Sequence, residues 1–482
     1  MKRTLAVAMV GVLAFAACTE SDSDGGSGGE SDGGSATTTT ADSAAEPTDA
    51  PSSTTGDTAA DSESDAESGT ENDTDNDTGT DTEPTTAPSD GSVVSEFAGE
   101  DWFAGTVPDS ATPADDDAEP IVIAMINQEN SPAGSFPELR AASEAAVAFI
   151  NAELGGVNGR PIDLRPCITD FSVEKSQACA QEAAQSGAVA VASGIDVGAN
   201  ASLPVLEQNG LPLVGGVPAT VAEMRATNAT FFSGGTTGAY MAFAEHAARE
   251  GRTKIAFAYG EFESFEVPVK EYGVPVAESL GLETELVPFP LIGADMLPVL
   301  TAAVDSGADA IVVGAADTAC VPTMTMLPEL GFEGQLYLTG ACAANEILAQ
   351  IPDDVQAEII FNSEGGVDQT TESALFDAAT ERYATEPAGG AGTVTFRSTL
   401  NLWNLLTSLD TIDAASVSEA LATSVDEPSF WGHPYTCATE QVPGMPSLCA
   451  PQQQLLRFID DGVSQPEDAS DGWIDVSTLF PS

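Results

Sequence analysis

The stretch AAVAFINAELGGVNGRPIDL, residues 145–164, decides the fold of this chain. Its first part continues a run of apolar side chains at helical spacing that begins near residue 138, so the pattern predicts an amphipathic helix over residues 138–151. The pair Gly155-Gly156 ends that helix. A short apolar run at residues 162–166 then predicts a strand, and a similar run at residues 121–126 precedes the helix. Strand, helix and strand in this order predict one unit of an α/β fold.

The same alternation continues along the chain. Further strands are expected at residues 188–192, 211–214, 255–259, 284–287, 310–313, 336–339 and 358–361. Helices are expected at residues 173–185, 199–208, 238–249, 267–280, 295–306 and 321–330. Such alternation implies parallel sheets with helices on both faces. A region of about 360 residues exceeds the size at which one core stops growing, so we expect two doubly wound, Rossmann-like lobes.

In such sheets, ligands bind outside the carboxyl ends of the strands. The residues at these places are small, carboxamide-bearing or hydroxyl-bearing, and some loops are rich in glycine, which allows a ligand to approach backbone N–H groups at helix N-termini. The same glycines are also what a tight turn between strand and helix needs. The expected ligand-binding residues are Asn127, Gln128, Asn130, Ser131, Asp196, Val197, Gly216, Pro218, Tyr259, Glu261, Phe262 and Asp317.

Motifs of catalysis are missing. The sequence has no phosphate loop, dinucleotide fingerprint, nucleophile elbow or HExxH motif. The only histidines, His246 and His433, lie far apart in the chain, and no CxxC occurs, so neither a catalytic triad nor a zinc site is expected. We therefore expect no catalytic residues, no metal and no cofactor.

The first residues predict export. A positive start, an apolar run at residues 5–17 and the small residues before Cys18 are typical of a signal peptide over residues 1–17. A cysteine at this place resembles the lipobox of bacterial lipoproteins, in which the signal is cut before the cysteine and a lipid is attached to its sulfur. The alternative is an ordinary cleaved signal with a chance cysteine. We expect an extracytoplasmic protein, lipid-anchored through Cys18 to the outer face of the membrane.

Export makes disulfides plausible for the six remaining cysteines. Their pairing cannot be read from the sequence, and taking nearest neighbours gives Cys167 with Cys179, Cys320 with Cys342, and Cys437 with Cys449. For Cys320 and Cys342 there is a topological reason as well. Each follows one of two strands joined by a single helix, and a right-handed crossover commonly sets such strands side by side.

Residues 18–118 form an acidic stretch of Ser, Thr and Gly with almost no large apolar side chains. Such a composition cannot offset its chain entropy, which predicts a disordered linker. The linker is interpreted either as a stalk that holds the domain off a membrane or as a solubilising spacer. The formal net charge of −62 argues against nucleic acid as a partner.

Residues 121–170, and above all the quoted stretch 145–164, resemble the substrate-binding lipoproteins of branched-chain amino acid type ABC transporters. The resemblance extends through residues 309–331 and covers about residues 121–458. It implies a type I periplasmic-binding-protein fold with three crossovers between the lobes. On this basis the N-terminal lobe is expected at residues 119–235 and 366–412, and the C-terminal lobe at residues 236–365 and 413–482.

Only some of the family's site residues have a counterpart in this sequence. Amino-acid binders of this family hold the ligand carboxylate with Ser and Thr hydroxyls, at places that fall here near Asp196-Val197 and Pro218-Ala219. The acidic partner of the ligand's ammonium group falls near Ala319, two residues after Asp317. These departures leave open an amide, an aromatic acid, a short carboxylate or another small metabolite.

The function expected from the sequence is capture of a small polar metabolite, such as an amino acid, amide or small carboxylate, between two lobes. A monomer would deliver it to an ABC permease in the membrane. One alternative is a ligand sensor of the same fold without transport. The alternative from another class is a secreted hydrolase on a two-lobed α/β frame.

Overall fold

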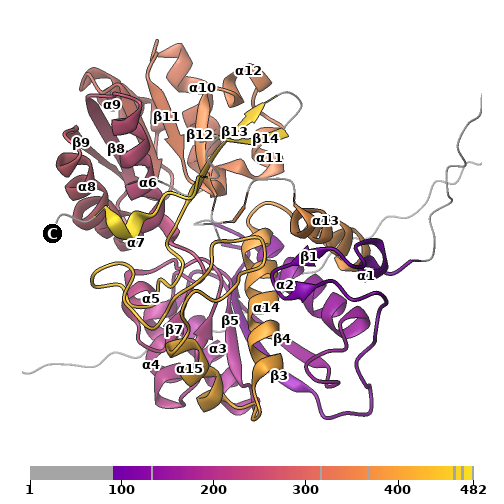
Figure 1. Cartoon of the computed structure of the whole chain (residues 1–482). Helices are drawn as coiled ribbons and strands as arrows, with labels where there is room; N and C mark the ends of the chain where they lie inside the picture. Colours follow the sequence, from indigo (N-terminus) through magenta and orange to yellow (C-terminus); the bar gives the residue numbers. More distant parts are fainter. Residues whose placement is uncertain are drawn as a thin grey trace, which may run out of the picture. The chain divides into compact units, whose positions relative to one another are not determined.

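The computed structural model describes residues 91–131, 134–314, 317–363, 365–366, 370–459, 463–467 and 472–479. The expected signal peptide, Cys18 and residues 19–90 of the expected linker lie outside these residues. Within them, two helix-covered sheets form two lobes (Figure 1). The predicted α/β class with doubly wound lobes is confirmed.

The N-terminal lobe is built on a five-stranded sheet of order β4-β3-β5-β6-β7, in which all neighbours are parallel. Its strands are β3 (Ile121–Gln128), β4 (Ile162–Thr169), β5 (Ala190–Ser193), β6 (Leu213–Val214) and β7 (Ala229–Thr230). Its helices are α2 (Pro137–Glu153), α3 (Val173–Gln185), α4 (Ala199–Gln208), α5 (Val221–Arg225), α13 (Thr371–Tyr383), α14 (Gly392–Ser408) and α15 (Ala414–Ala422).

The C-terminal lobe is built on a seven-stranded sheet of order β14-β13-β12-β11-β10-β8-β9, with β13 and β14 antiparallel. Its strands are β8 (Lys254–Gly260), β9 (Glu283–Phe289), β10 (Ala310–Gly314), β11 (Gln335–Leu338), β12 (Ile359–Ser363), β13 (Gln454–Ile459) and β14 (Val463–Pro466). Its α-helices are α6 (Gly235–Arg249), α7 (Glu263–Val267), α8 (Val274–Ser279), α9 (Met296–Asp305), α10 (Cys320–Glu329), α11 (Asn345–Leu348) and α12 (Asp353–Gln356). Between α7 and α8 lies a π-helical segment, η1 (Pro268–Gly273). Short 3₁₀ helices are η2 (Asp317–Ala319), η3 (Gly340–Ala343) and η4 (Val476–Thr478).

The stretch that decides the fold adopts the expected conformation. Helix α2 ends at Glu153, and Gly155 and Gly156 follow with φ of 77° and 63°, which L side chains rarely adopt. A Cβ on Gly156 would lie 2.2 Å from the carbonyl oxygen of Arg160. Only glycine therefore allows the chain to turn this tightly from α2 into β4.

The linker boundary expected at residue 118 is wrong. Residues 91–118 contain α1 (Val93–Glu96), β1 (Asp101–Trp102) and β2 (Gly105–Thr106), and they pack on the N-terminal lobe. Trp102 is buried, with its ring centroid 5.9 Å from that of Trp403 in α14. The few apolar residues of this segment thus gain their burial from a surface far along the chain, which local composition does not reveal. We call residues 91–118 the N-terminal strap.

The second lobe boundary, expected at residue 412, also needs correction. Val417 and Leu421 of α15 are buried in the core of the N-terminal lobe, together with Phe430, Tyr435 and Cys449. The chain passes between the lobes from β7 to α6, from β12 to α13, and from Ala450 to β13. These are the three crossovers that the resemblance implied, with the last one later than expected.

The three expected cysteine pairs are all bonded. The Cα–Cα distances are 5.6 Å for Cys167–Cys179, 5.4 Å for Cys320–Cys342 and 4.8 Å for Cys437–Cys449. Strands β10 and β11 are parallel neighbours, as the crossover argument required for the second pair.

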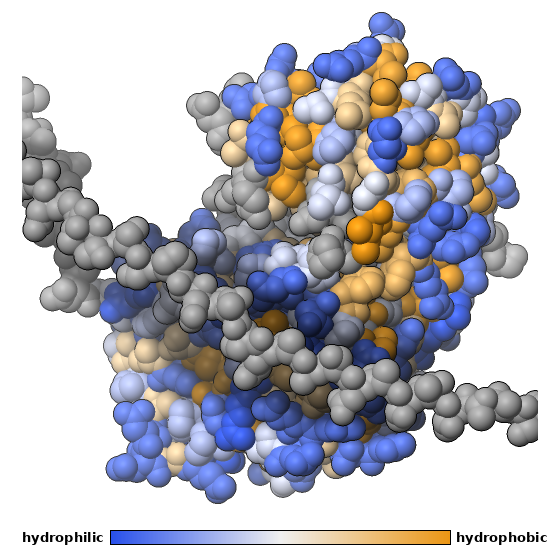
Figure 2. Space-filling view, turned by 180° about the vertical axis from the view of Figure 1, so that it is seen from behind, coloured by the Kyte–Doolittle hydropathy of each residue, from blue (hydrophilic) through white to orange (hydrophobic). Residues whose placement is uncertain are grey.

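Large apolar side chains reach the surface mainly on the C-terminal lobe, which lies at the upper right in Figure 2. Leu286 of β9 is 37% exposed, Ile292 in the loop between β9 and α9 is 52% exposed, and Leu297 of α9 is 48% exposed. Among the described residues, no helix combines the length and apolarity that crossing a membrane requires.

Candidate functional site

Asn127 and Gln128 lie at the carboxyl end of β3 and are fully buried. The Asn127 amide group donates to the Phe136 carbonyl (2.8 Å) and to Glu129 Oε1 (3.2 Å), and its oxygen accepts from the Ile195 N–H (3.2 Å). Asn127 thus ties two loops to the strand end. Gln128 Nε2 donates to the Gly134 carbonyl (2.9 Å), but its Oε1 is buried without a partner. This oxygen is an acceptor that a bound polar group could satisfy.

Asn130 and Ser131 follow at the rim of the same loop. Asn130 is exposed, has φ of 58°, and its N–H donates to Ser135 Oγ (3.0 Å). Ser131 is half-buried. Both side chains therefore reach the surface beside the end of β3, where the sequence predicted ligand contacts.

A charged cluster that the sequence did not reveal holds this loop. Arg140 of α2 pairs with Glu129 (2.8 Å), Glu144 (2.9 Å) and Glu386 (2.7 Å). The hydrogen bond to Glu129 and the other two carboxylates raise the pKa of Arg140 against the opposing effect of burial. An Arg followed by Glu four residues later is a helix-surface signal, but Glu129 and Glu386 come together only through the fold.

Asp196 lies after β5 and is buried, with Val197 half-buried beside it. Its carboxylate accepts hydrogen bonds from Ser176 Oγ, Thr169 Oγ1 (3.2 Å) and the Gly198 N–H (3.1 Å). Burial raises the pKa of Asp196 despite these three donors. The side chain thus joins the ends of β4 and β5 to α3.

A second buried carboxylate lies near Asp196. Burial, and then the charge of Asp196, raise the pKa of Glu223 in α5 to about 8. Glu223 Oε2 accepts from the N–H groups of Ala219 (3.0 Å) and Thr220 (2.8 Å), which forms the capping box of α5. Glu223 Oε1 has no partner.

Gly216 and Pro218 lie in the loop between β6 and α5. Gly216 has φ of 70°, and a Cβ there would lie 2.0 Å from the Ser193 carbonyl oxygen. Its N–H donates to Ser398 Oγ of α14 (3.1 Å). Pro218 is buried, and a Cβ on Gly235 would lie 2.9 Å from its Cγ. Close approach of backbone segments accounts for the glycine here.

The predicted residues of the C-terminal lobe lie after β8 and β10. Tyr259 is 2% exposed, with Lys270 Nζ 5.9 Å from its ring centroid. Glu261 is exposed, and Phe262 is half-buried. Asp317 begins η2 after β10, but its side chain lies outside what the structure describes.

Three contacts join the two lobes beside these strand ends. The rings of Phe171, after β4, and Phe262, after β8, have centroids 5.8 Å apart. Arg225 of α5 pairs with Glu271 of η1 (2.8 Å), and Tyr272 Oη donates to the Pro443 carbonyl (3.1 Å). Phe171 was not predicted, and its φ of 76° is strained for a residue with a side chain. An aromatic residue two positions after the end of β4 was the one sequence signal available.

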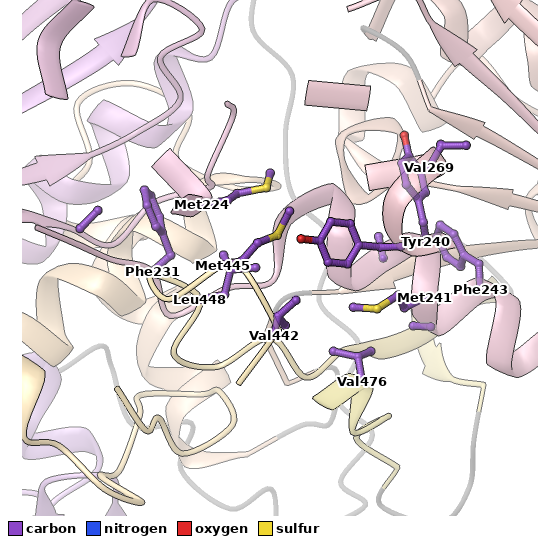
Figure 3. Close-up of a cluster of buried hydrophobic side chains, with 14 of the residues drawn as sticks. Met224, Phe231, Tyr240, Met241, Phe243, Val269, Val442, Met445, Leu448 and Val476 are labelled. Carbon is purple, nitrogen blue, oxygen red and sulfur yellow. The ribbon is translucent and has the colours of Figure 1, made fainter. Parts of the chain in front are cut away.

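Behind these contacts, an apolar cluster also spans the lobes (Figure 3). Tyr240 of α6 extends toward Met445 and Met224, which belong to segments packed on the N-terminal lobe. The Tyr240 hydroxyl is buried without a partner, and a Cβ on Gly314 would lie 1.7 Å from it. Glycine at the end of β10 thus makes room for this ring.

A pocket of about 410 Å³ lies elsewhere, between β4 and α3 beside the Cys167–Cys179 disulfide. All its lining residues belong to the N-terminal lobe, so it is not a site between the lobes. The histidines are also away from the strand ends. His246 Nδ1 is 2.9 Å from the hydroxyl of Tyr337 inside the C-terminal lobe, and His433 is half-buried, with its ring centroid 5.5 Å from that of Trp473.

Solved structures share this architecture at low sequence identity. A leucine-binding protein from Thermotoga maritima is 14% identical with a TM-score of 0.60, and the match covers 72% of this chain and 98% of that one. An extracellular ligand-binding receptor from Verminephrobacter eiseniae is 16% identical with a TM-score of 0.60, covering 73% and 100%. An ABC transporter solute-binding protein from R. palustris, solved in complex with 4-hydroxybenzoate, is 17% identical with a TM-score of 0.60, covering 73% and 96%.

None of the curated proteins matches the sequence. A family model does: residues 120–446 match the one described as periplasmic binding protein. This match reaches into both lobes and includes the first two crossovers, and its start at residue 120 leaves the N-terminal strap outside. The chain therefore belongs to the periplasmic binding protein family and has the two-lobed type I fold.

Proposed function

We propose that this protein is an extracytoplasmic solute-binding protein that captures a small polar metabolite between its lobes and delivers it to an ABC permease. The observation that carries the proposal is the contact of Phe171 with Phe262, because it brings the strand ends of both sheets together at one place. A solute that touches both lobes only when they are closed favours the closed form by its differential affinity.

The predicted site residues fall into two groups, direct solute contacts and residues that position the loops. Gln128, Asn130 and Ser131 from one lobe, and Tyr259, Glu261, Phe262 and Asp317 from the other, would contact the solute directly. Asn127 and Asp196 already have protein partners, so we assign them to positioning the loops, together with Val197, Gly216 and Pro218. The free Gln128 Oε1 suits a solute with a hydrogen-bond donor, such as an amino acid or an amide.

The test is a thermal-shift screen of the purified protein against amino acids, amides and organic acids, including L-leucine and 4-hydroxybenzoate. A compound at 100 times its dissociation constant adds about 2.7 kcal/mol of stability. We expect at least one compound to raise the melting temperature saturably. No shift across the screen would contradict the proposed solute class.

Compounds that bind are then compared in two variants. Phe262→Ala removes the proposed interlobe contact and should weaken binding at least tenfold. Phe97→Ala, a half-buried phenylalanine of the N-terminal strap, is the matched control and should bind as the wild type does. Equal affinities in both variants would reject the placement of the site.

The lipid anchor forms a separate part of the proposal. We propose that Cys18, outside the described residues, carries the lipid and that the chain after it links the domain to the membrane. Cys18→Ala should move the protein from the membrane pellet to the soluble fraction, since the lipid is its proposed membrane attachment. A variant that stays in the pellet with its signal cleaved would contradict lipidation.

A further inference from the structure

Two carboxylates, those of the buried Glu153 and the half-buried Glu372, hold the N-terminal strap on the N-terminal lobe. Glu153, at the end of α2, accepts hydrogen bonds from the N–H groups of Val93 (3.1 Å) and Val94 (2.9 Å). Glu372, in the first turn of α13, accepts one from the N–H of Phe103 (2.7 Å). Each carboxylate thus accepts hydrogen bonds from backbone N–H groups of the strap, which would otherwise have to be hydrogen-bonded to water.

The further contacts of the two carboxylates differ. Glu153 also accepts from the Tyr383 hydroxyl and pairs with Arg382 (3.6 Å), both in α13, whereas Glu372 contacts Trp431. The other oxygen of Glu372 accepts from the Trp431 N–H, and the Trp431 carbonyl accepts from the Gly366 N–H (2.8 Å). Gly366 lies in the crossover from β12 to α13. One carboxylate therefore connects the strap, through Trp431, to a crossover between the lobes. Trp431 has φ of 43°, a strained value for a residue with a side chain.

A second crossover joins the same arrangement through Arg397 of α14. Arg397 is 2% exposed and donates to the Phe232 carbonyl (3.2 Å), just before the passage from β7 to α6. A Cβ on Gly365 would lie 2.7 Å from Arg397 Nη1, and one on Gly432 would lie 2.8 Å from its Cδ. Both crossovers and the Trp431 loop are thus packed against one buried side chain.

We propose that Glu372 is a positioning residue for lobe movement. Through Trp431 it fixes the backbone conformation of the crossover at Gly366. Because the same carboxylate also holds the strap, the conformation of this crossover depends on whether the strap is docked. Closure of a two-lobed protein is absorbed by backbone changes at a few residues between the lobes. Hydrogen bonds that fix these residues narrow the range of lobe orientations. The inference rests on the two-lobed movement of the proposed function, but not on the identity of the solute.

Amide hydrogen exchange with peptide resolution tests the connection without any solute. The variants are Glu372→Gln and the matched control Glu153→Gln; each replaces one acceptor oxygen by an NH₂ group that cannot accept. Both should speed exchange within residues 91–118. Only Glu372→Gln should also speed exchange, at least tenfold, in peptides that contain Gly366 and Trp431.

Lobe positions are measured in the same variants by spin-label distances between Glu207→Cys in α4 and Glu329→Cys in α10. We expect a broader distance distribution in Glu372→Gln than in Glu153→Gln. Faster exchange confined to the strap in both variants would overturn the connection, and an unchanged distance distribution would overturn the positioning role. If Glu372→Gln does not fold, Glu372→Asp takes its place, since its shorter carboxylate cannot reach both N–H donors at once. A failure of the solute screen would leave these results standing, so the two proposals fail separately.

Discussion

At the scale of single residues, Glu467 shows how buried charges are compensated in the C-terminal lobe. Burial by itself would raise the pKa of this carboxyl group. Hydrogen bonds from His246 and Arg457, and their charges, outweigh it and lower the pKa of Glu467 to about 2. Because the folded pKa lies below the unfolded one, the group stabilises the fold above about pH 4, and this contribution is lost as the pH falls toward 2.

Glu467→Gln should therefore lower the free energy of unfolding at pH 7 by about 1 to 2 kcal/mol, a value discounted because the group is only half-buried. The difference from the wild type should shrink as the pH falls from 5 to 2. Urea unfolding at several pH values measures this, with the exposed Glu329→Gln as control. A difference that does not change with pH would contradict the assignment.

Sequence reasoning located the loops at the strand ends but not the hydrogen-bond partners within them. Asn127 and Asp196 were predicted because they follow apolar runs, and both do lie at strand ends. Their hydrogen-bond partners, such as the Ile195 N–H and Ser176 Oγ, lie 68 and 20 positions away in the sequence. Spacing along a strand says nothing about such partners. The sequence therefore does not distinguish a side chain that holds a loop from one that binds a solute.

At the scale of elements, the alternating strands and helices up to residue 361 were largely predicted, whereas the long helices α13 and α14 were not. Helices α3 and α4 have the predicted bounds, and α3 begins at a Ser172 cap that accepts from the Lys175 N–H. Strands β13 and β14 and the short elements of the N-terminal strap were not predicted either. Their stability comes from pairing with β12 and from contacts with Glu153 and Glu372, which are remote in the sequence.

The Cys320–Cys342 disulfide joins the start of α10 to η3 and closes a loop with a sequence separation of 22. The chain-entropy estimate gives about 3 kcal/mol for a loop of this length. Replacing both cysteines by serine should lower the unfolding free energy by about this amount, measured by urea unfolding. Peptide mapping of the oxidised wild type is the control. A peptide that links Cys320 to Cys167 would contradict the pairing and the lobe assignment.

At the scale of the whole molecule, the lobes meet through an apolar cluster and, beside the strand ends, through the contact of Phe171 with Phe262. We expect a substitution at this ring contact to change the relative position of the lobes. Phe171→Gly removes the ring contact with Phe262 and relieves the positive φ of residue 171. We expect a larger radius of gyration in small-angle X-ray scattering without loss of thermal stability, because glycine adopts this backbone conformation freely. Asn158→Gly, which relieves φ of 53° away from the lobe contacts, is the matched control.

An increase in the radius of gyration in both glycine variants would mean that backbone relaxation, and not the ring contact, sets the lobe position. The two-lobed architecture itself was predictable, since alternating strands and helices exceeded the length of one core. The last crossover was not, because α15 carries the same apolar periodicity whichever lobe it packs against.

The docked strap also fixes the path by which mechanical load enters the domain. A pull on the amino end of the described chain reaches first the Gly91 carbonyl, held by Arg382 (2.9 Å), and then the N–H groups held by Glu153. These bonds carry the tension into α13 and α2, both in the N-terminal lobe. None of these bonds involves a residue of the C-terminal lobe. Drag on a domain held by its amino end would thus strain the strap before it could pull the two lobes apart.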